Sequence, residues 1–180
     1  YFNLIKMKKK NKIKNDIKVL HLGFSDSPKS GSSMAMVNIH KDLIKNKINS
    51  SLLVVQKYSF NKRVVQFDYI QRKINFLKRL FTFSLKKIQN FGNIDIHRSY
   101  NYFNSNYVVN KINNSSKKII HLHWVHGEMI STEDIIKIKK PIIWTLHDAW
   151  ITNPTIHVDI KNQEKFMVRS GIENFFLKRK

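Results

Sequence analysis

Two clusters of histidine, tryptophan and aspartate hold most of the side chains that could do chemistry in this sequence, and each follows a short apolar run. The clusters are His121, His123, Trp124 and His126, and then Thr145, His147, Asp148 and Trp150. Histidine and aspartate can hold or move a proton at a ligand hydroxyl group, and tryptophan offers a flat apolar face for stacking. The clusters therefore predict a ligand-binding site.

The residues around each cluster predict the elements that position it. Residues 119–122 and 141–146 are apolar and rich in β-branched side chains, which is typical of buried parallel strands. Between them, residues 131–134 (Ser-Thr-Glu-Asp) precede an apolar stretch, which indicates a helix with a Ser/Thr cap and an acidic first turn. Strand, helix and strand form a βαβ unit, and ligands bind outside the carboxyl ends of such strands. Both clusters are expected at that edge.

Hydrophobic periodicity predicts further strands and helices upstream. The expected strands span residues 17–24, 51–57 and 64–67. One helix is expected directly after the loop 25–33, a second at residues 70–91 and a third at residues 106–113. Alternation of strands and helices indicates an α/β fold, with a Rossmann-like parallel sheet and helices on both faces.

The loop 25–33 (Ser-Asp-Ser-Pro-Lys-Ser-Gly-Ser-Ser) is a third candidate site, between a strand and a helix start. Its backbone N–H groups, its hydroxyls and the positive end of the helix suit an anionic group. Gly31 would allow close approach, and Ser32 and Ser33 would supply hydrogen bonds. The loop matches neither the dinucleotide fingerprint nor the P-loop pattern, so an ordinary loop with a serine helix cap explains it about as well.

The histidines of the first cluster have different expected roles. His121 and His123 share one face of their strand, with His123 nearer its end. We expect His121 to be a buried, hydrogen-bonded histidine and His123 to lie nearer the polar mouth of the sheet. With His126 they could bind a metal, but no carboxylate or cysteine accompanies them at a fitting spacing, so we predict no metal and no cofactor. For Asp148, the alternative to a chemical role is a structural cap of the next turn.

These segments resemble the N-terminal half of a family-4, retaining glycosyltransferase of the GT-B type, especially the branch that builds bacterial capsular polysaccharides and exopolysaccharides. The resemblance rests on His-Leu-His-Trp at 121–124 and on Trp-Thr-Leu-His-Asp-x-Trp at 144–150. It extends to the first strand with its small-residue loop and to the second strand, and so covers most of residues 17–157. Beyond residue 150 the chain departs from the family: His157 keeps its place, but both glycines and the preceding aromatic residue are gone.

The resemblance implies the strand order 3-2-1-4-5 and transfer of a sugar from a nucleotide-sugar to a sugar or lipid-linked glycan acceptor, with retained anomeric configuration and no required metal. It implies catalytic roles for His123, His147 and Asp148. Substrate binding would fall to Gly31, Ser32, Ser33, Trp124, Trp150 and His157. The chain would supply the acceptor side. Because we find no counterpart of the family's second domain, we expect the chain alone to be inactive.

Composition limits the remaining possibilities. A chain of 180 residues with 42% hydrophobic content suits one domain, which we place at 17–160, between basic segments 1–16 and 161–180. The sequence contains no cysteine, which excludes disulfides and thiolate metal sites. It has no signal-peptide pattern, and no stretch approaches the roughly 20 apolar residues of a membrane-spanning helix. We therefore expect a cytoplasmic protein, peripheral to a membrane at most.

The net charge of +21 is the strongest bias in the composition. It comes mainly from lysine spread along the chain, without an Arg-rich recognition helix, a zinc finger or an aromatic RNA-binding strand, so we expect no nucleic-acid partner. A membrane surface or a nucleotide substrate explains the charge at least as well. The competing hypothesis is a non-catalytic basic α/β module that holds an anionic partner.

The helix at 70–91 has apolar residues three or four apart and basic residues elsewhere around it. We expect its apolar stripe to pack on the sheet while its lysines stay in water. The alternative is that the helix lies in a membrane interface.

Overall fold

The structure, a computed structural model, describes residues 17–88 and 100–148. Within these ranges five strands form one parallel sheet in the order β3-β2-β1-β4-β5. The strands are β1 (Lys18–Ser25), β2 (Asn49–Gln56), β3 (Val64–Gln66), β4 (Ile119–Leu122) and β5 (Ile142–Trp144). The helices are α2 (Gly31–Lys45), α3 (Tyr69–Ile88), α4 (Asn106–Asn113) and α5 (Thr132–Ile136).

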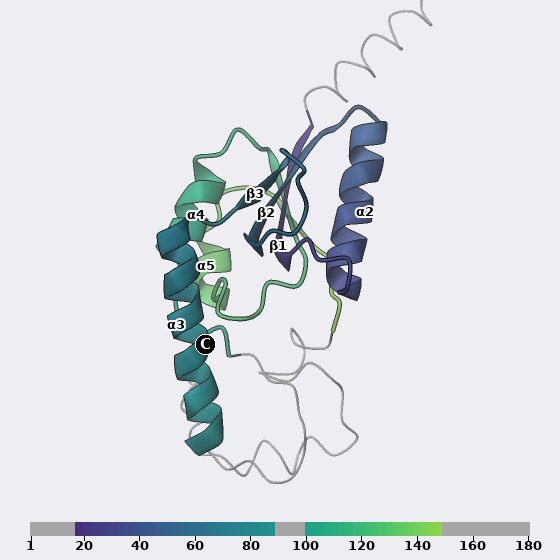
Figure 1. Cartoon of the computed structure of the whole chain (residues 1–180). Helices are drawn as coiled ribbons and strands as arrows, with labels where there is room; N and C mark the ends of the chain where they lie inside the picture. The colour runs from purple at the N-terminus through teal and green to yellow at the C-terminus, as the bar shows by residue number, and fades with distance from the viewer. Residues whose placement is uncertain (1–16, 89–99, 149–180) are drawn as a thin grey trace, which may run out of the picture.

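The helices flank the sheet on both faces, with α2 on one side and α3, α4 and α5 on the other (Figure 1). The predicted fold class and strand order are therefore confirmed. Because the chain winds from β1 to β3 in one direction and then continues at β4 on the other side of β1, the order reverses between β1 and β4. Ligands of open α/β sheets bind at the carboxyl ends of the strands at such a switch point.

Burial follows from this layering. The central strands β1, β2 and β4 have nearly continuous runs of buried residues, as expected where helices cover both faces. The edge strand β5 differs from the prediction of a buried strand, since the side chain of Ile143 is 51% exposed. An edge strand has a neighbour on one side only, so less of its surface is covered.

The start of α5 has the predicted cap. The hydroxyl of Ser131 accepts the N–H of Asp134 at 3.1 Å, and the Asp134 carboxylate accepts the N–H of Ser131 at 3.2 Å, which together form a capping box. The same carboxylate accepts the N–H of Ser105 at 2.6 Å, just before α4. One fully buried aspartate therefore joins the starts of two helices that cover the sheet.

Helix α3 does not pack as predicted. In its part with described side chains, residues 69–85, the buried ones are Asn75 and Thr82, which are polar. Nδ2 of Asn75 donates to the carbonyls of Gly127 and Glu128 at 2.9 and 3.0 Å. Its exposed apolar side chains are Tyr69, Ile70, Ile74, Phe76, Leu77, Leu80, Phe81 and Phe83. The core on this face of the sheet is filled by α4 and residues 125–138 instead. The expectation that the apolar stripe packs on the sheet is therefore wrong.

None of the helices in the described ranges is long and apolar enough to cross a membrane.

Candidate functional site

Three strand ends bring the predicted residues together. In the parallel register His21 of β1 lies beside His121 of β4, and Leu122 of β4 lies beside Trp144 of β5. The residues that follow β4 and β5 therefore leave the sheet at the same edge as the loop after β1. The described residues of both clusters lie at the carboxyl ends of their strands, as the sequence predicts.

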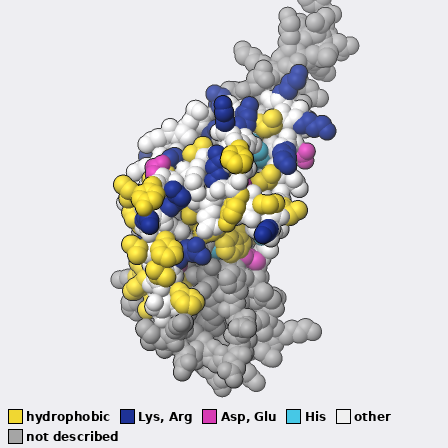
Figure 2. Space-filling view, viewed as in Figure 1, with side chains coloured by type: hydrophobic (Ala, Val, Ile, Leu, Met, Phe, Trp, Pro, Cys, Tyr) yellow, Lys and Arg dark blue, Asp and Glu magenta, His cyan; other side chains and the backbone are white. Residues whose placement is uncertain are grey.

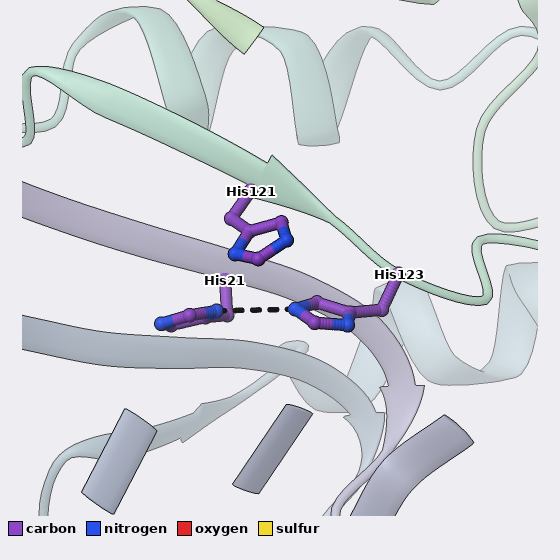
Figure 3. Close-up of side chains that lie close together, drawn as sticks. All are labelled: His21, His121 and His123. Carbon is purple, nitrogen blue, oxygen red and sulfur yellow. Dashed lines mark hydrogen bonds between the residues drawn. The ribbon is translucent and has the colours of Figure 1, made fainter. Parts of the chain in front are cut away.

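A row of imidazoles crosses the strands at this edge. Nδ1 of His21 lies 3.2 Å from Nε2 of His123, and Nδ1 of His123 lies 3.3 Å from Nε2 of His147. Figure 3 shows the rings of His21 and His123 end to end, with His121 above the gap between them. The ring of His121 lies 4.1 Å from that of His123, and its Nε2 is 2.8 Å from Oγ1 of Thr145. The expected shared face, and the burial of a hydrogen-bonded His121, are confirmed.

These imidazoles are uncharged near neutral pH. Burial, followed by the nearby His121 and His40, lowers the pKa of His21 to about 3. Burial, followed by His121, His21 and His147, lowers the pKa of His123 to about 2. Burial also lowers the pKa of His121 and of His147, although Asp148 opposes the shift at His147. A neutral imidazole has one N–H and one lone pair, so hydrogen bonds along the row run in one direction, and the tautomers of the row are coupled.

His123 is more enclosed than predicted. Its side chain contributes to the wall of a cleft of about 310 Å³, yet the residue is 2% exposed and both ring nitrogens lie within hydrogen-bonding distance of other histidines. His147, at the outer end of the row, is only partly buried and lines an adjoining cleft. A ligand in the adjoining cleft can therefore contact His147 directly and affect His123 through it.

Asp148 holds the neighbouring tryptophan in place. Its carboxylate accepts the indole N–H of Trp124 at 3.1 Å and lies 3.3 Å from Nε2 of His126. Phe24 packs edge-on against Trp124, with the ring centres 6.0 Å apart. His126 thus belongs to this group and not to the row of imidazoles. These contacts orient the indole of Trp124 in the wall shared by the two clefts.

The serine- and glycine-containing segment is partly helical, which corrects the predicted loop. Gly31, Ser32 and Ser33 form the first turn of α2, after the N-cap residue Ser30. A Cβ atom at Gly31 would meet no protein atom within 4 Å, and Gly31 lines a cleft, so the predicted close approach of a ligand there stays a prediction. Gly23 is crowded by contrast, because a Cβ there would lie 2.7 Å from Sδ of Met36.

The N-terminus of α2 is nevertheless suited to an anion. Its first turn contains no acidic residue, and the Ser30 side chain makes no capping hydrogen bond. The first N–H groups of any helix lack intrahelical partners and carry partial positive charge. Lys29 and the serines of this segment line the cleft of about 310 Å³ beside His123. The serines and Lys29 therefore lie with the start of the helix on one side of the cleft.

The adjoining cleft, of about 430 Å³, unites the three candidate sites. It is lined by Ser30, Gly31, Ser32, Trp124, His147 and Asp148. Both volumes fall in the range of small-molecule sites. Trp150 and His157, the other predicted substrate-binding residues, lie outside the described residues, as do the basic segment 1–16 and the segment 161–180.

The residue that sequence reasoning missed is His21. Its side chain is completely buried, and its Nε2 atom has no hydrogen-bond partner in the described structure. The signal was available: His21-Leu22 in the first strand repeats His121-Leu122 in the fourth, and neighbouring parallel strands in register place such residues side by side.

The fold and the site define an α/β protein with a Rossmann-like parallel sheet and a polar cleft at its switch point. Comparisons with protein-family models, with curated proteins and with solved structures found no match to this chain.

Proposed function

We propose that this chain is the acceptor-side, N-terminal domain of a retaining glycosyltransferase of the GT-B type, which moves a sugar from a nucleotide-sugar to a hydroxyl group of a sugar or lipid-linked glycan. The observation that carries the proposal is the convergence of Ser30, Gly31, Ser32, Trp124, His147 and Asp148 on one cleft. Most of these residues belong to the segments that resemble the family, yet they are far apart in the sequence.

The anionic part of the substrate would lie against the start of α2. A nucleotide-sugar carries phosphate groups, and the free N–H groups of the first helical turn, with Lys29 beside them, form a binding site for phosphate oxygens. The +21 net charge would also raise the local concentration of an anionic substrate.

The reacting sugar would lie against Trp124 and His147. The indole offers an apolar face, held by its hydrogen bond to Asp148. His147 is the accessible end of the imidazole row, and its contact with His123 couples a proton at a ligand hydroxyl to the tautomer of the buried ring. In this arrangement His147 contacts the ligand, His123 orients His147, and Asp148 positions Trp124.

We also propose an anionic membrane surface as the place where this domain works. The outward face of α3 exposes Ile70, Leu77 and Leu80, and Lys73 is exposed on the same helix. Figure 2 shows apolar side chains gathered over this helix, with basic ones among them. An apolar face combined with lysines is the pattern of helices that bind in a lipid interface. A membrane location would suit a lipid-linked acceptor.

The test is sugar transfer by a completed enzyme. The chain is joined to the nucleotide-sugar-binding half of a family-4 enzyme, and transfer from a labelled nucleotide-sugar to a lipid-linked sugar is measured. We expect His147→Ala and His123→Ala to lower turnover at least about tenfold, or roughly 1.4 kcal/mol. His40→Ala is the control, because His40 is buried in α2 against Ser50 and lines neither cleft.

Two outcomes would contradict the proposal. Transfer from a nucleotide-sugar by the unjoined chain would show that the domain is not merely an acceptor half. If the fusion is active and both His147→Ala and His123→Ala keep full turnover, the cleft takes no part in sugar transfer. The competing binding-module hypothesis predicts no transfer from any fusion, together with retained binding to an anionic partner.

A further inference from the structure

We propose that His21, His121 and His123 form a binding site for a divalent transition-metal ion, and that the ion is Zn²⁺. One nitrogen atom from each of these side chains lies within 4.8 Å of the others. Figure 3 shows the three rings gathered around a common point between β1 and β4. The site goes beyond the proposed sugar transfer and stands whether or not that proposal holds.

The spacing of the nitrogen atoms is close to what zinc requires. Two imidazole nitrogens bound to tetrahedral zinc, each at about 2.0–2.1 Å, lie roughly 3.3 Å apart. Nδ1 of His21 and Nε2 of His123 are separated by 3.2 Å. With zinc bound, both nitrogens would offer their lone pairs to a shared ion in place of the hydrogen bond between them, and His121 lies above the same gap.

The chemistry of the donors selects the class of metal. The cluster consists of imidazoles, with neither a carboxylate nor a thiolate among its members. Imidazole suits zinc, copper and nickel, whereas magnesium and calcium prefer oxygen ligands. Three protein ligands leave a fourth position, and His123 borders a cleft through which water or another ligand could reach it.

The outer nitrogens of His121 and His123 already have the partners that such a site needs, whereas Nε2 of His21 has none among the described residues. Metal-binding histidines commonly donate their other N–H group to a neighbouring acceptor, which fixes the tautomer and the ring. Nε2 of His121 lies 2.8 Å from Oγ1 of Thr145, and Nδ1 of His123 lies 3.3 Å from Nε2 of His147. If both outer nitrogens donate, the inner nitrogens keep their lone pairs for the metal.

The prediction of no metal from sequence considered a different set of histidines. It combined His121 and His123 with His126, but His126 lies 3.3 Å from the Asp148 carboxylate. The third histidine of the proposed site is His21, which lies on a strand about 100 positions earlier in the sequence.

The test uses the whole 180-residue chain, freed of metal with a chelator. Zinc is titrated in competition with a chromogenic chelator, and cobalt is used as a spectroscopic probe. We expect one zinc ion per chain and intense visible cobalt bands, which mark tetrahedral coordination. Loss of a residue that only supports a metal ligand commonly weakens metal binding roughly 10- to 100-fold. Because His21 is itself a proposed ligand, we expect His21→Asn to weaken zinc binding by at least that much. His40→Asn is the matched control, since His40 is also buried and its ring lies 6.1 Å from that of His21.

A second measurement needs no variant. In the ¹⁵N-labelled wild-type chain, zinc should shift the imidazole nitrogens of His21, His121 and His123 and leave those of His40 unchanged. This readout remains valid if His21→Asn fails to fold. Absence of zinc binding by the wild type, equal binding by His21→Asn, or shifts confined to other histidines would overturn the proposal.

Discussion

The imidazole row and helix α3 break the usual rule of burial in opposite directions. At the strand ends, polar rings are buried, with His21 0% and His123 2% exposed. On α3, apolar side chains lie outside, with Ile70 68% and Leu77 62% exposed, while Asn75 is buried. Burial of a polar group costs free energy unless the group is hydrogen-bonded. An exposed apolar patch becomes favourable only when a partner covers it, so such a patch often marks an interaction site.

The two regions therefore have different needs. The imidazoles are hydrogen-bond partners of one another, with nitrogen–nitrogen distances of 3.2 and 3.3 Å, so their burial is largely compensated within the domain. The apolar face of α3 gains stability only by contact with something outside the described domain. We expect changes in the row to alter folding stability, and changes on the outer face of α3 to alter association. The predictions below test this contrast, from the largest effect to the smallest.

The largest expected effect is acid destabilisation of the metal-free protein. The pKa of His21 is lowered to about 3 and that of His123 to about 2, each from an ordinary value of 6.5. As the pH falls below 6.5, these two histidines bind protons in the unfolded chain but stay uncharged in the folded protein. The free energy of unfolding should then fall by up to about 1.4 kcal/mol per pH unit for each imidazole, until the pH reaches the folded pKa values. Glu128 acts in the opposite direction, because burial raises its pKa.

Urea unfolding between pH 7 and pH 5, with a chelator present, measures this slope. His21→Asn removes one of the two groups and should make the slope shallower. A free energy of unfolding that stays flat across this range in the wild type would show that the imidazoles ionise normally, and that the row is open to water.

The next effect concerns the membrane surface. Replacing Ile70, Leu77 and Leu80 with glutamine should weaken binding to anionic vesicles at least about a hundredfold, since each buried aliphatic side chain contributes about 1.5–3 kcal/mol. Phe60→Gln is the control, because Phe60 is fully exposed but lies outside α3. Flotation should also weaken as salt rises, because exposed charges are screened over about 8 Å at physiological ionic strength.

The basic side chains that face the domain are poor choices for this test. Lys78 donates to the carbonyl of Asn104 at 2.8 Å, and Arg79 lies over the ring of Phe24. Reversing their charge would disturb folding as well as association. A nucleic-acid mobility shift in the same buffer provides the opposing test: tight nucleic-acid binding without flotation would contradict the membrane proposal and favour the basic-module hypothesis.

A third prediction compares the two faces of α3 directly. Asn75→Ala removes the donor to the carbonyls of Gly127 and Glu128 and should lower the free energy of unfolding by about 1–3 kcal/mol. Leu77→Ala should change it by no more than about 0.5 kcal/mol, because its side chain is exposed. Thermal and urea unfolding measure both. A larger loss for Leu77→Ala than for Asn75→Ala would mean that the helix packs by its apolar face after all.

The smallest expected effect separates the two glycines near the cleft. In Gly23→Ala the new Cβ would lie 2.7 Å from Sδ of Met36, which must move, at a cost of about 1 kcal/mol or more. In Gly31→Ala the new Cβ meets nothing within 4 Å, and alanine in a helix is favoured over glycine by roughly 0.5–1 kcal/mol. Urea unfolding should show a lower free energy of unfolding for Gly23→Ala and a higher one for Gly31→Ala. Destabilisation by Gly31→Ala would show that the first turn of α2 is crowded.

Local patterns in the sequence predicted most of the architecture. The helix at 106–113 was predicted with its observed bounds, and the strands at 17–24 and 51–57 were predicted within two residues. These elements depend on periodicity and capping, which involve residues close together in the chain. The same reasoning placed His121 and His123 on one face, because alternation along a strand needs no knowledge of the neighbours.

Contacts between distant segments were decided by the tertiary structure alone. His21 joined the site because the parallel register places it beside His121, and no local pattern specifies that register. The orientation of α3 depended on competition: α4 and residues 125–138 fill the core on their face of the sheet, and the carbonyls of Gly127 and Glu128 need a donor that Asn75 supplies. The sequence by itself determined which side chains could form strands, helices and a polar strand end. Only the folded chain determined which of them meet, because burial and hydrogen bonding are satisfied between segments far apart in sequence.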